Sequence, residues 1–126
     1  GVMHRNTFIN SSKLLNPTVN LKSDERFYFA GQITGSEGYM AAIATGYMAA
    51  TNIMNKLEGK EPFILDNRSS IGSIIEYITE EKKDFQPMGP NFGIIRSLEG
   101  KRIKDKIERY NAISQIALEY IKSINN

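Results

Sequence analysis

The chain of 126 residues contains no cysteine and a single histidine, His4. The absence of cysteine excludes disulfides, thiolate nucleophiles and cysteine metal sites, and we expect the chain to bind no metal. No apolar run is long enough to span a bilayer, so we expect no membrane partner and a cytoplasmic location. The 16 lysines and arginines nearly balance the 14 acidic residues. Net charge therefore argues neither for nor against nucleic acid as a partner.

The length of the chain fits one domain with a modest core, which is too small for a complete enzyme with two substrates. Its first residues, GVMHRN, resemble neither a translation start nor a leader peptide. We therefore expect residues 1–126 to be a single piece of a longer chain. Residues 1–58 should supply a strand, a glycine turn and a helix, and residues 59–126 a helical segment.

The aromatic run RFYFA, residues 26–30, is typical of a strand that is buried on both faces of a parallel sheet. Weaker strand candidates lie at residues 2–9 and 18–21, and residues 11–15 could form one helical turn before Pro17. The strands that should flank RFYFA are not evident in the chain. The fold class that we predict is α/β, or α+β for the isolated piece, with few strands and three main helices.

Helical periodicity predicts the first main helix over residues 37–57, with Gly59 as its stop. Its large apolar residues share one face, and small residues keep the other side thin for close packing. Isoleucines between residues 71 and 78 mark a second helix, with Ser69 or Ser70 as its N-cap. The last helix carries an apolar stripe from Ile103 to Ile124, which we expect to face inward. Segment 80–96 has too many prolines and glycines for regular structure.

The stretch FAGQITGSEGY, residues 29–39, places glycines at positions 31, 35 and 38 between the aromatic run and the first main helix. A helix N-terminus exposes unpaired N–H groups that attract phosphate or an electron-rich carbonyl, and glycine lets a ligand approach the backbone. The spacing differs from the dinucleotide fingerprint G-x-G-x-x-G. From these residues alone, a ligand site and a turn made tight for packing are equally good interpretations.

Three stretches of the chain together point to one family. They are FAGQITGSEGY with the following MAAIATGYMAATNIMNKLEGKEP, GVMHRNTFINSSKLL at the start, and FQPMGPNFGIIR at residues 85–96. All three resemble the folate- and flavin-dependent tRNA uracil-5-methyltransferases, and the first is similar to the C-terminal flavin-binding segment of that family. The related glucose-inhibited division protein A family has a similar A-G-Q-I-x-G stretch.

The resemblance implies that residues 1–126 are a single C-terminal fragment of a larger flavoprotein, with residues 1–58 on the flavin side. They would form the C-terminal part of a Rossmann-like FAD-binding domain, in an enzyme that methylates C5 of the T-loop uridine of tRNA. The implied reaction uses 5,10-methylenetetrahydrofolate, FAD and a reduced nicotinamide, NADH or NADPH. The family's catalytic residues lie upstream, so we expect none in this chain and no activity from the fragment alone. Two alternatives stay open: a portion of a glucose-inhibited division protein A-type flavoprotein that modifies the tRNA wobble uridine, or a non-enzymatic RNA- or protein-binding module.

The resemblance assigns the cofactor contacts to the glycine-rich stretch. Gln32 would hydrogen-bond the ribityl chain or the pyrophosphate, and the amides of residues 35–39 would face the flavin pyrimidine edge, where fixed dipoles stabilise negative charge. The full set is Gly31, Gln32, Ile33, Thr34, Gly35, Glu37, Gly38 and Tyr39. The chain has Ala41 where the family usually has an acidic residue.

Five further residues are candidates for the substrate side: His4, Arg5, Asn6, Asn91 and Phe92. A plainer interpretation stands beside them, because a lone histidine is more often structural or exposed and Asn6 could cap a turn. The basic residues between positions 101 and 109 could meet tRNA phosphate or form the solvated face of a helix. Because RFYFA would leave an unpaired apolar strand edge, we expect the fragment to form a homodimer.

Overall fold

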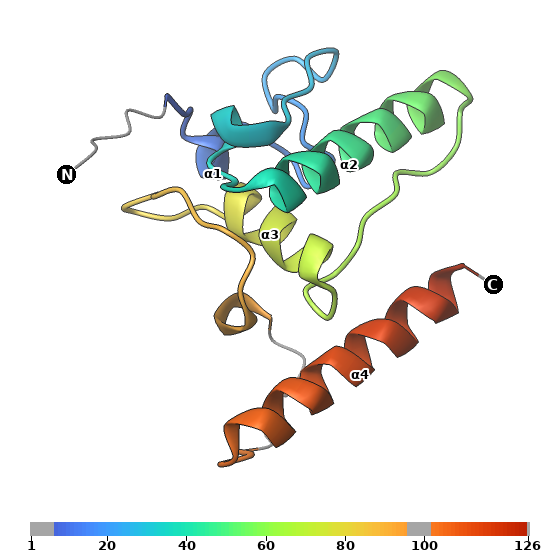
Figure 1. Ribbon diagram of the computed structural model, residues 1–126. Helices are drawn as coiled ribbons and strands as arrows, with labels where there is room; N and C mark the ends of the chain where they lie inside the picture. The colour runs from blue at the N-terminus through green and yellow to red at the C-terminus, as the bar shows by residue number, and fades with distance from the viewer. Residues whose placement is uncertain (1–6, 96–101, 126) are drawn as a thin grey trace.

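The computed structural model describes residues 7–95 and 102–125. Its elements in chain order are α1 (Ser11–Leu14), the 3-10 helix η1 (Gly31–Thr34), α2 (Tyr39–Leu57), α3 (Ser70–Thr79), the 3-10 helix η2 (Phe92–Ile94) and α4 (Lys106–Ile124). In Figure 1, α1, η1, α2 and α3 gather in one body, and α4 runs along its lower edge. Within that body α3 contacts α1, α2 and η2.

The predicted strands are the main error of the sequence interpretation. The described residues contain isolated bridges in place of strands, at Leu15–Leu21, Asn20–Tyr28 and Ser36–Met88. In RFYFA, Arg26 lies in a turn and bonds the Asp24 carboxylate, and Phe27 is 54% exposed. A strand needs neighbours that take up its backbone N–H and C=O groups. The described residues offer Tyr28 a single bridge, so they form a mostly helical body without the predicted Rossmann-like strands.

The core lies on both sides of α3. Ile74, Ile75 and Ile78 are buried there against Met48 of α2 and Val19 of the loop that follows α1. The helix begins where its N-cap satisfies the first turn, since the Ser69 hydroxyl accepts a 2.9 Å hydrogen bond from the Gly72 N–H. Ser69, and not Ser70, is therefore the cap. The one-turn helix that we predicted at residues 11–15 is confirmed as α1.

Helix α2 buries the side opposite to the one that its large apolar residues predict. Thr45, Met48 and Asn52 face the core together with small alanines. The predicted stripe is exposed instead, at Met40, Ile43, Tyr47, Met54 and Leu57. The thin side packs because small residues let helices approach closely. The helix ends as expected, with Gly59 in a left-handed conformation at φ 68°.

Helix α4 starts later than its apolar stripe, which begins with Ile103. The cap is Asp105, whose Oδ1 accepts a 2.8 Å hydrogen bond from the Glu108 N–H. Ile113 is buried, but Ile107 is 71% exposed, so the inward stripe is only partly realised. Contacts from two tyrosines hold α4 to the body: Tyr110 stacks on Phe92, and the Tyr120 hydroxyl accepts from the Asp66 N–H at 2.9 Å.

The sequence also led us to expect no membrane-spanning segment and a homodimer. No helix in the described part of the chain is both long and apolar enough to cross a membrane. In the described residues RFYFA forms no flat strand edge, so this reason for a homodimer does not hold. The dimer stays a prediction. It now rests on the exposed stripe of α2, which leaves an apolar surface uncovered.

Candidate functional site

The glycine-rich stretch forms η1 and a sharp entry into α2. Gly31, Gly35 and Gly38 all have positive φ, at 77°, 82° and 94°. L residues with side chains rarely adopt this conformation, so the chain direction here depends on glycine. The stretch divides into a buried half, which holds its own backbone, and an exposed half, which faces solvent.

The buried half is held by hydroxyl groups around the carbonyl of Gly31. Thr34 Oγ1 donates to this carbonyl at 2.6 Å and Ser36 Oγ at 2.9 Å, while the Gly31 N–H donates to Thr45 Oγ1 at 2.8 Å. Both Thr34 and Ser36 are buried. Thr34, which we predicted to contact a cofactor, thus uses its hydroxyl within the chain. Ser36 and Thr45 were not predicted. The available signal was a serine between two of the glycines and a threonine in the helix that follows them.

Gly35 belongs to the same buried half, for a steric reason. A Cβ built on Gly35 would come within 2.5 Å of Cζ of Phe85. The tight-packing interpretation of this glycine therefore holds at position 35. Sequence reasoning missed Phe85, although it opens the third of the stretches that resemble the methyltransferases.

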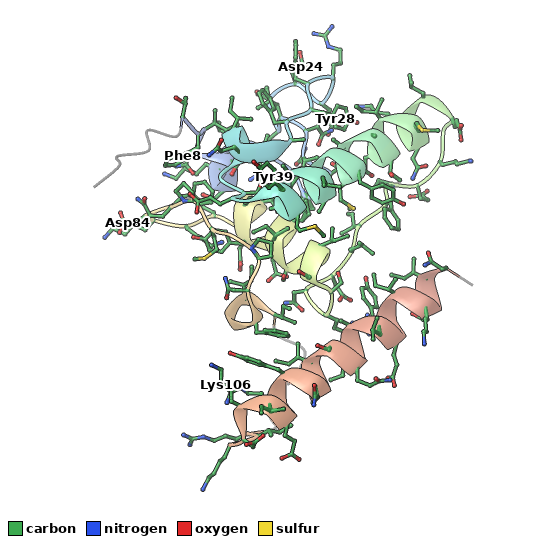
Figure 2. All side chains as sticks on the ribbon, in the orientation of Figure 1. Phe8, Asp24, Tyr28, Tyr39, Asp84 and Lys106 are labelled. Carbon is green, nitrogen blue, oxygen red and sulfur yellow. The ribbon has the colours of Figure 1, made fainter. Side chains whose placement is uncertain are left out.

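The exposed half contains the other predicted cofactor residues: Gln32, Ile33, Glu37, Gly38 and Tyr39. Tyr39, labelled at the start of α2 in Figure 2, is 91% exposed. No side chain caps the helix at Gly38, and the first-turn N–H groups of Tyr39 and Met40 have no acceptor within the helix. An added Cβ at Gly31 or Gly38 would meet no atom within 4 Å. Open space therefore lies beside both glycines.

The three family-like stretches meet at this site. From the N-terminal stretch GVMHRNTFINSSKLL, the Ile9 N–H donates to the Ile33 carbonyl at 2.9 Å, and Ser11 Oγ donates to the Thr34 carbonyl at 2.6 Å. From the third, the Met88 N–H donates to the Gly35 carbonyl at 2.9 Å. In return, the Glu37 N–H donates to the Met88 carbonyl at 3.0 Å. Segments far apart in the sequence thus build one support for the exposed amides.

The substrate-side candidates are only partly placed. His4, Arg5 and Asn6 lie outside the described residues. Asn91 serves the backbone, since its Oδ1 accepts from the Gly93 N–H at 2.8 Å and its Nδ2 donates to the Gly89 carbonyl at 3.0 Å. Phe92 stacks on Tyr110 with ring centroids 4.2 Å apart. Neither residue is among those that contact the glycine-rich stretch through hydrogen bonds.

An apolar groove adjoins the site along α2. It has a volume of about 560 Å³ and lies between Met40, Ile43 and Tyr47 on one side and Ile71 and Pro90 on the other. Ala41, where the resemblance led us to expect an acidic residue, is fully buried in the core. A carboxylate there would lose its hydration, so alanine suits this packing. No cluster of three or more metal-ligating side chains occurs among the residues in view.

One family model and several individual proteins are similar to this chain. The family model described as glucose inhibited division protein A matches residues 1–61. A methylenetetrahydrofolate–tRNA-(uracil-5-)-methyltransferase of Fusobacterium nucleatum subsp. nucleatum is 63% identical over 98% of this chain and 28% of its own length. The enzyme of the same name from Sulfurihydrogenibium sp. is 52% identical over 97% of the chain and 28% of its own length. That of Streptococcus uberis is 45% identical over 100% of the chain and 29% of its own length.

The matches cover nearly all of this chain but only a part of each relative. It spans less than a third of the length of the relatives, 28% of the Fusobacterium enzyme, and is aligned with them almost from end to end. The three stretches that meet at the glycine-rich site are all inside the aligned part. The chain therefore belongs, as a segment, to the family of the methylenetetrahydrofolate–tRNA-(uracil-5-)-methyltransferases.

Proposed function

We propose that the full-length protein that contains this chain methylates C5 of the T-loop uridine of tRNA. It would use 5,10-methylenetetrahydrofolate as carbon donor, with FAD and a reduced nicotinamide as electron carriers. Because its substrate would be tRNA, we also propose a cytoplasmic location for it. The observation that carries the proposal is the meeting of three family-like stretches around one glycine-rich helix start, in a chain 63% identical to a methyltransferase so named.

The role that we propose for this segment is to form one side of the FAD site. The residues fit such a group, because the N–H groups of Tyr39 and Met40 are unsatisfied within α2 and open space lies beside Gly31 and Gly38. Gln32 would hydrogen-bond the ribityl chain or the pyrophosphate. The buried hydroxyl network would hold these exposed groups in position. Bound FAD would supply the redox chemistry that the methyl transfer requires.

Two glycines of matched geometry test this role. Gly31 and Gly59 both have positive φ and no atom within 4 Å of an added Cβ, but only Gly31 lies at the proposed site. Gly31→Ala in the full-length protein should lower bound FAD per protein, measured by visible absorbance after purification. Gly59→Ala carries a comparable backbone strain of about 1 kcal/mol and should leave FAD content unchanged. Equal FAD content in both variants would contradict the assignment.

The activity itself is tested by methylation of a tRNA transcript with the folate donor, FAD and a reduced nicotinamide. The full-length protein should form 5-methyluridine in the T loop, and the isolated 126-residue segment should not, because it spans only 28% of the related Fusobacterium enzyme. A modified wobble uridine would favour the glucose-inhibited division protein A-type alternative. A full-length protein that binds tRNA but retains no flavin would favour the non-enzymatic binding module.

A further inference from the structure

We propose that the cleft between η2 and the start of α4 binds RNA, holding backbone phosphates with Arg102 and Lys104 and stacking a base against Phe92 and Tyr110. This inference rests on the proposed function, which makes tRNA the substrate, and it names a contact surface for that substrate. The surface lies apart from the hydrogen-bonded support of the glycine-rich stretch.

The cleft combines positive charge with flat rings. It has a volume of about 580 Å³, and Arg102, Lys104 and Arg109 line it together with Phe92 and Tyr110. No carboxylate is among the described residues that line it. Although the chain as a whole has 16 basic and 14 acidic residues, the described lining of this cleft carries charge of one sign. A one-signed cleft attracts a ligand of opposite charge.

The cations of the cleft are not neutralised within the described part of the chain. The ion pairs among the described residues lie outside the cleft and use Arg26, Lys56, Lys60, Arg68 and Lys82. The charges of Lys104 and Lys106 also lie at the N-terminal end of α4, where the helix dipole disfavours cations. Asp105 offsets them in part as N-cap, but its Oδ1 already accepts the Glu108 N–H. A bound phosphate would relieve this repulsion.

The aromatic pair gives the cleft a second property that a simple anion site does not need. The Phe92 and Tyr110 rings are 10° from parallel with centroids 4.2 Å apart, and Phe92 remains 37% exposed. The Lys106 ammonium, at the lower left of the molecule in Figure 2, lies 5.6 Å from the Tyr110 ring centroid. Unpaired bases stack on such rings with little dependence on sequence.

Arg109 connects the two sides of this arrangement. Its guanidinium donates to the Ile103 carbonyl at 3.4 Å and lies 5.5 Å from the centroid of the Tyr110 ring. Arg109 thus joins the chain before α4 to the stacked pair. Arg102 and Lys104, by contrast, are exposed and remain available to a ligand. An unpaired base with its adjoining phosphates, as in an RNA loop, uses both the ring and the cations; an acidic peptide would use only the cations.

The test measures binding of an unmodified tRNA to the full-length protein as a function of salt. Arg102→Gln combined with Lys104→Gln should weaken binding about tenfold at moderate salt and lower the slope of log Kd against log salt by about 2, one for each lost phosphate contact. The matched control is Lys13→Gln with Lys122→Gln, which removes the same charge from exposed positions outside the cleft. The control should keep the wild-type slope.

A second variant tests the stacking independently. Phe92→Leu should weaken tRNA binding about fivefold or more without changing the salt slope, and should leave heparin binding unchanged because heparin has no bases. Phe27→Leu, at an exposed phenylalanine outside the cleft, should change neither.

The outcomes separate the cleft from the proposed function. Suppose that the wild type binds tRNA, retains FAD and methylates. If the cleft variants then keep the wild-type salt slope, or the control variant loses as much tRNA affinity as they do, the cleft inference is wrong and the proposed function stands. A wild type that binds no tRNA contradicts both. Unchanged FAD content and turnover at saturating tRNA, with a raised KM for tRNA, support the cleft.

Discussion

The ring of Phe85 occupies the space that a side chain on Gly35 would need, since an added Cβ would lie 2.5 Å from Cζ of Phe85. Gly35→Ala should therefore lower the free energy of unfolding by about 2–4 kcal/mol, through overpacking and a positive φ of 82°. Urea denaturation of the 126-residue chain measures this. The same variant would lose flavin for a packing reason, so Gly35 cannot report on the cofactor.

A double variant checks the cause. Phe85→Leu shortens the side chain opposite Gly35, and in that background Gly35→Ala should cost at least about 1 kcal/mol less than in the wild type, because residues in contact are not additive. Equal costs in the two backgrounds would mean that the Phe85 ring is not what excludes a side chain at Gly35.

Two glycines inside helices should respond in opposite directions. A Cβ on Gly72 in α3 would collide with the backbone carbonyl of Asp66, which cannot rotate away. Gly72→Ala should cost about 3 kcal/mol or more. Gly46 in α2 has no atom within 4 Å of an added Cβ, so Gly46→Ala should stabilise by up to about 1 kcal/mol. Thermal unfolding by circular dichroism compares both; a neutral Gly72→Ala would contradict the close approach.

The contact of Asp66 with Arg68 should make stability depend on pH in the acid range. Hydrogen bonds from the Arg68 guanidinium, at 2.6 and 3.0 Å, hold the pKa of the Asp66 carboxyl below its usual value of 3.8. Because the pKa is lowered, the ionised Asp66 carboxylate contributes fully to the free energy of unfolding at pH values above its usual pKa. This contribution is lost as pH falls through the lower pKa of the folded state.

At neutral pH Asp66→Asn removes the stabilisation that comes from the ionised Asp66 carboxylate. In strong acid the wild-type carboxyl is already protonated, so the substitution no longer removes this stabilisation. The difference in unfolding free energy between wild type and Asp66→Asn should therefore be constant from pH 7 to about pH 5 and shrink below about pH 4. The difference stays small because Arg68 and Asp66 are both exposed. Urea titrations at pH 7 and pH 3 measure it. A difference that grows in acid would reverse the assigned sign.

The uncovered stripe of α2 predicts self-association of the isolated chain. Ile43 is 67% exposed on this stripe, and Ile107 is 71% exposed on α4. Sedimentation equilibrium at micromolar concentration should show a dimer, and Ile43→Glu should shift it toward monomer. Ile107→Glu, a change of equal chemistry at equal exposure, should leave the dimer intact. A monomeric wild type, or equal dissociation by both variants, would contradict the stripe as the contact surface.

Local signals predicted the helices well. Ser69 and Gly59 have a direct physical role at helix ends, so a single sequence can locate them. The glycine-rich entry to α2 was located for the same reason, since Gly31, Gly35 and Gly38 have backbone angles that favour glycine.

Features that depend on distant partners could not be predicted. RFYFA resembles a buried strand because Phe27 and Phe29 are apolar, but strand formation requires neighbours, and the described residues provide Tyr28 with one bridge. The burial of α2 was reversed for a related reason: Tyr47 is larger and more apolar than Thr45, yet Thr45 is buried because it bonds the Gly31 N–H. Phe85 escaped notice because its contact with Gly35 joins residues fifty positions apart.

Hydrogen exchange of the full-length protein, with and without FAD, tests the central claim most directly. The account predicts that FAD slows exchange of the amides at Gly38, Tyr39 and Met40, which have no acceptor within the first turn of α2. The core of α3, residues 74–78, serves as internal reference and should not change. If FAD protects other segments of the protein while residues 31–40 exchange at the same rate as before, this segment does not form part of the cofactor site.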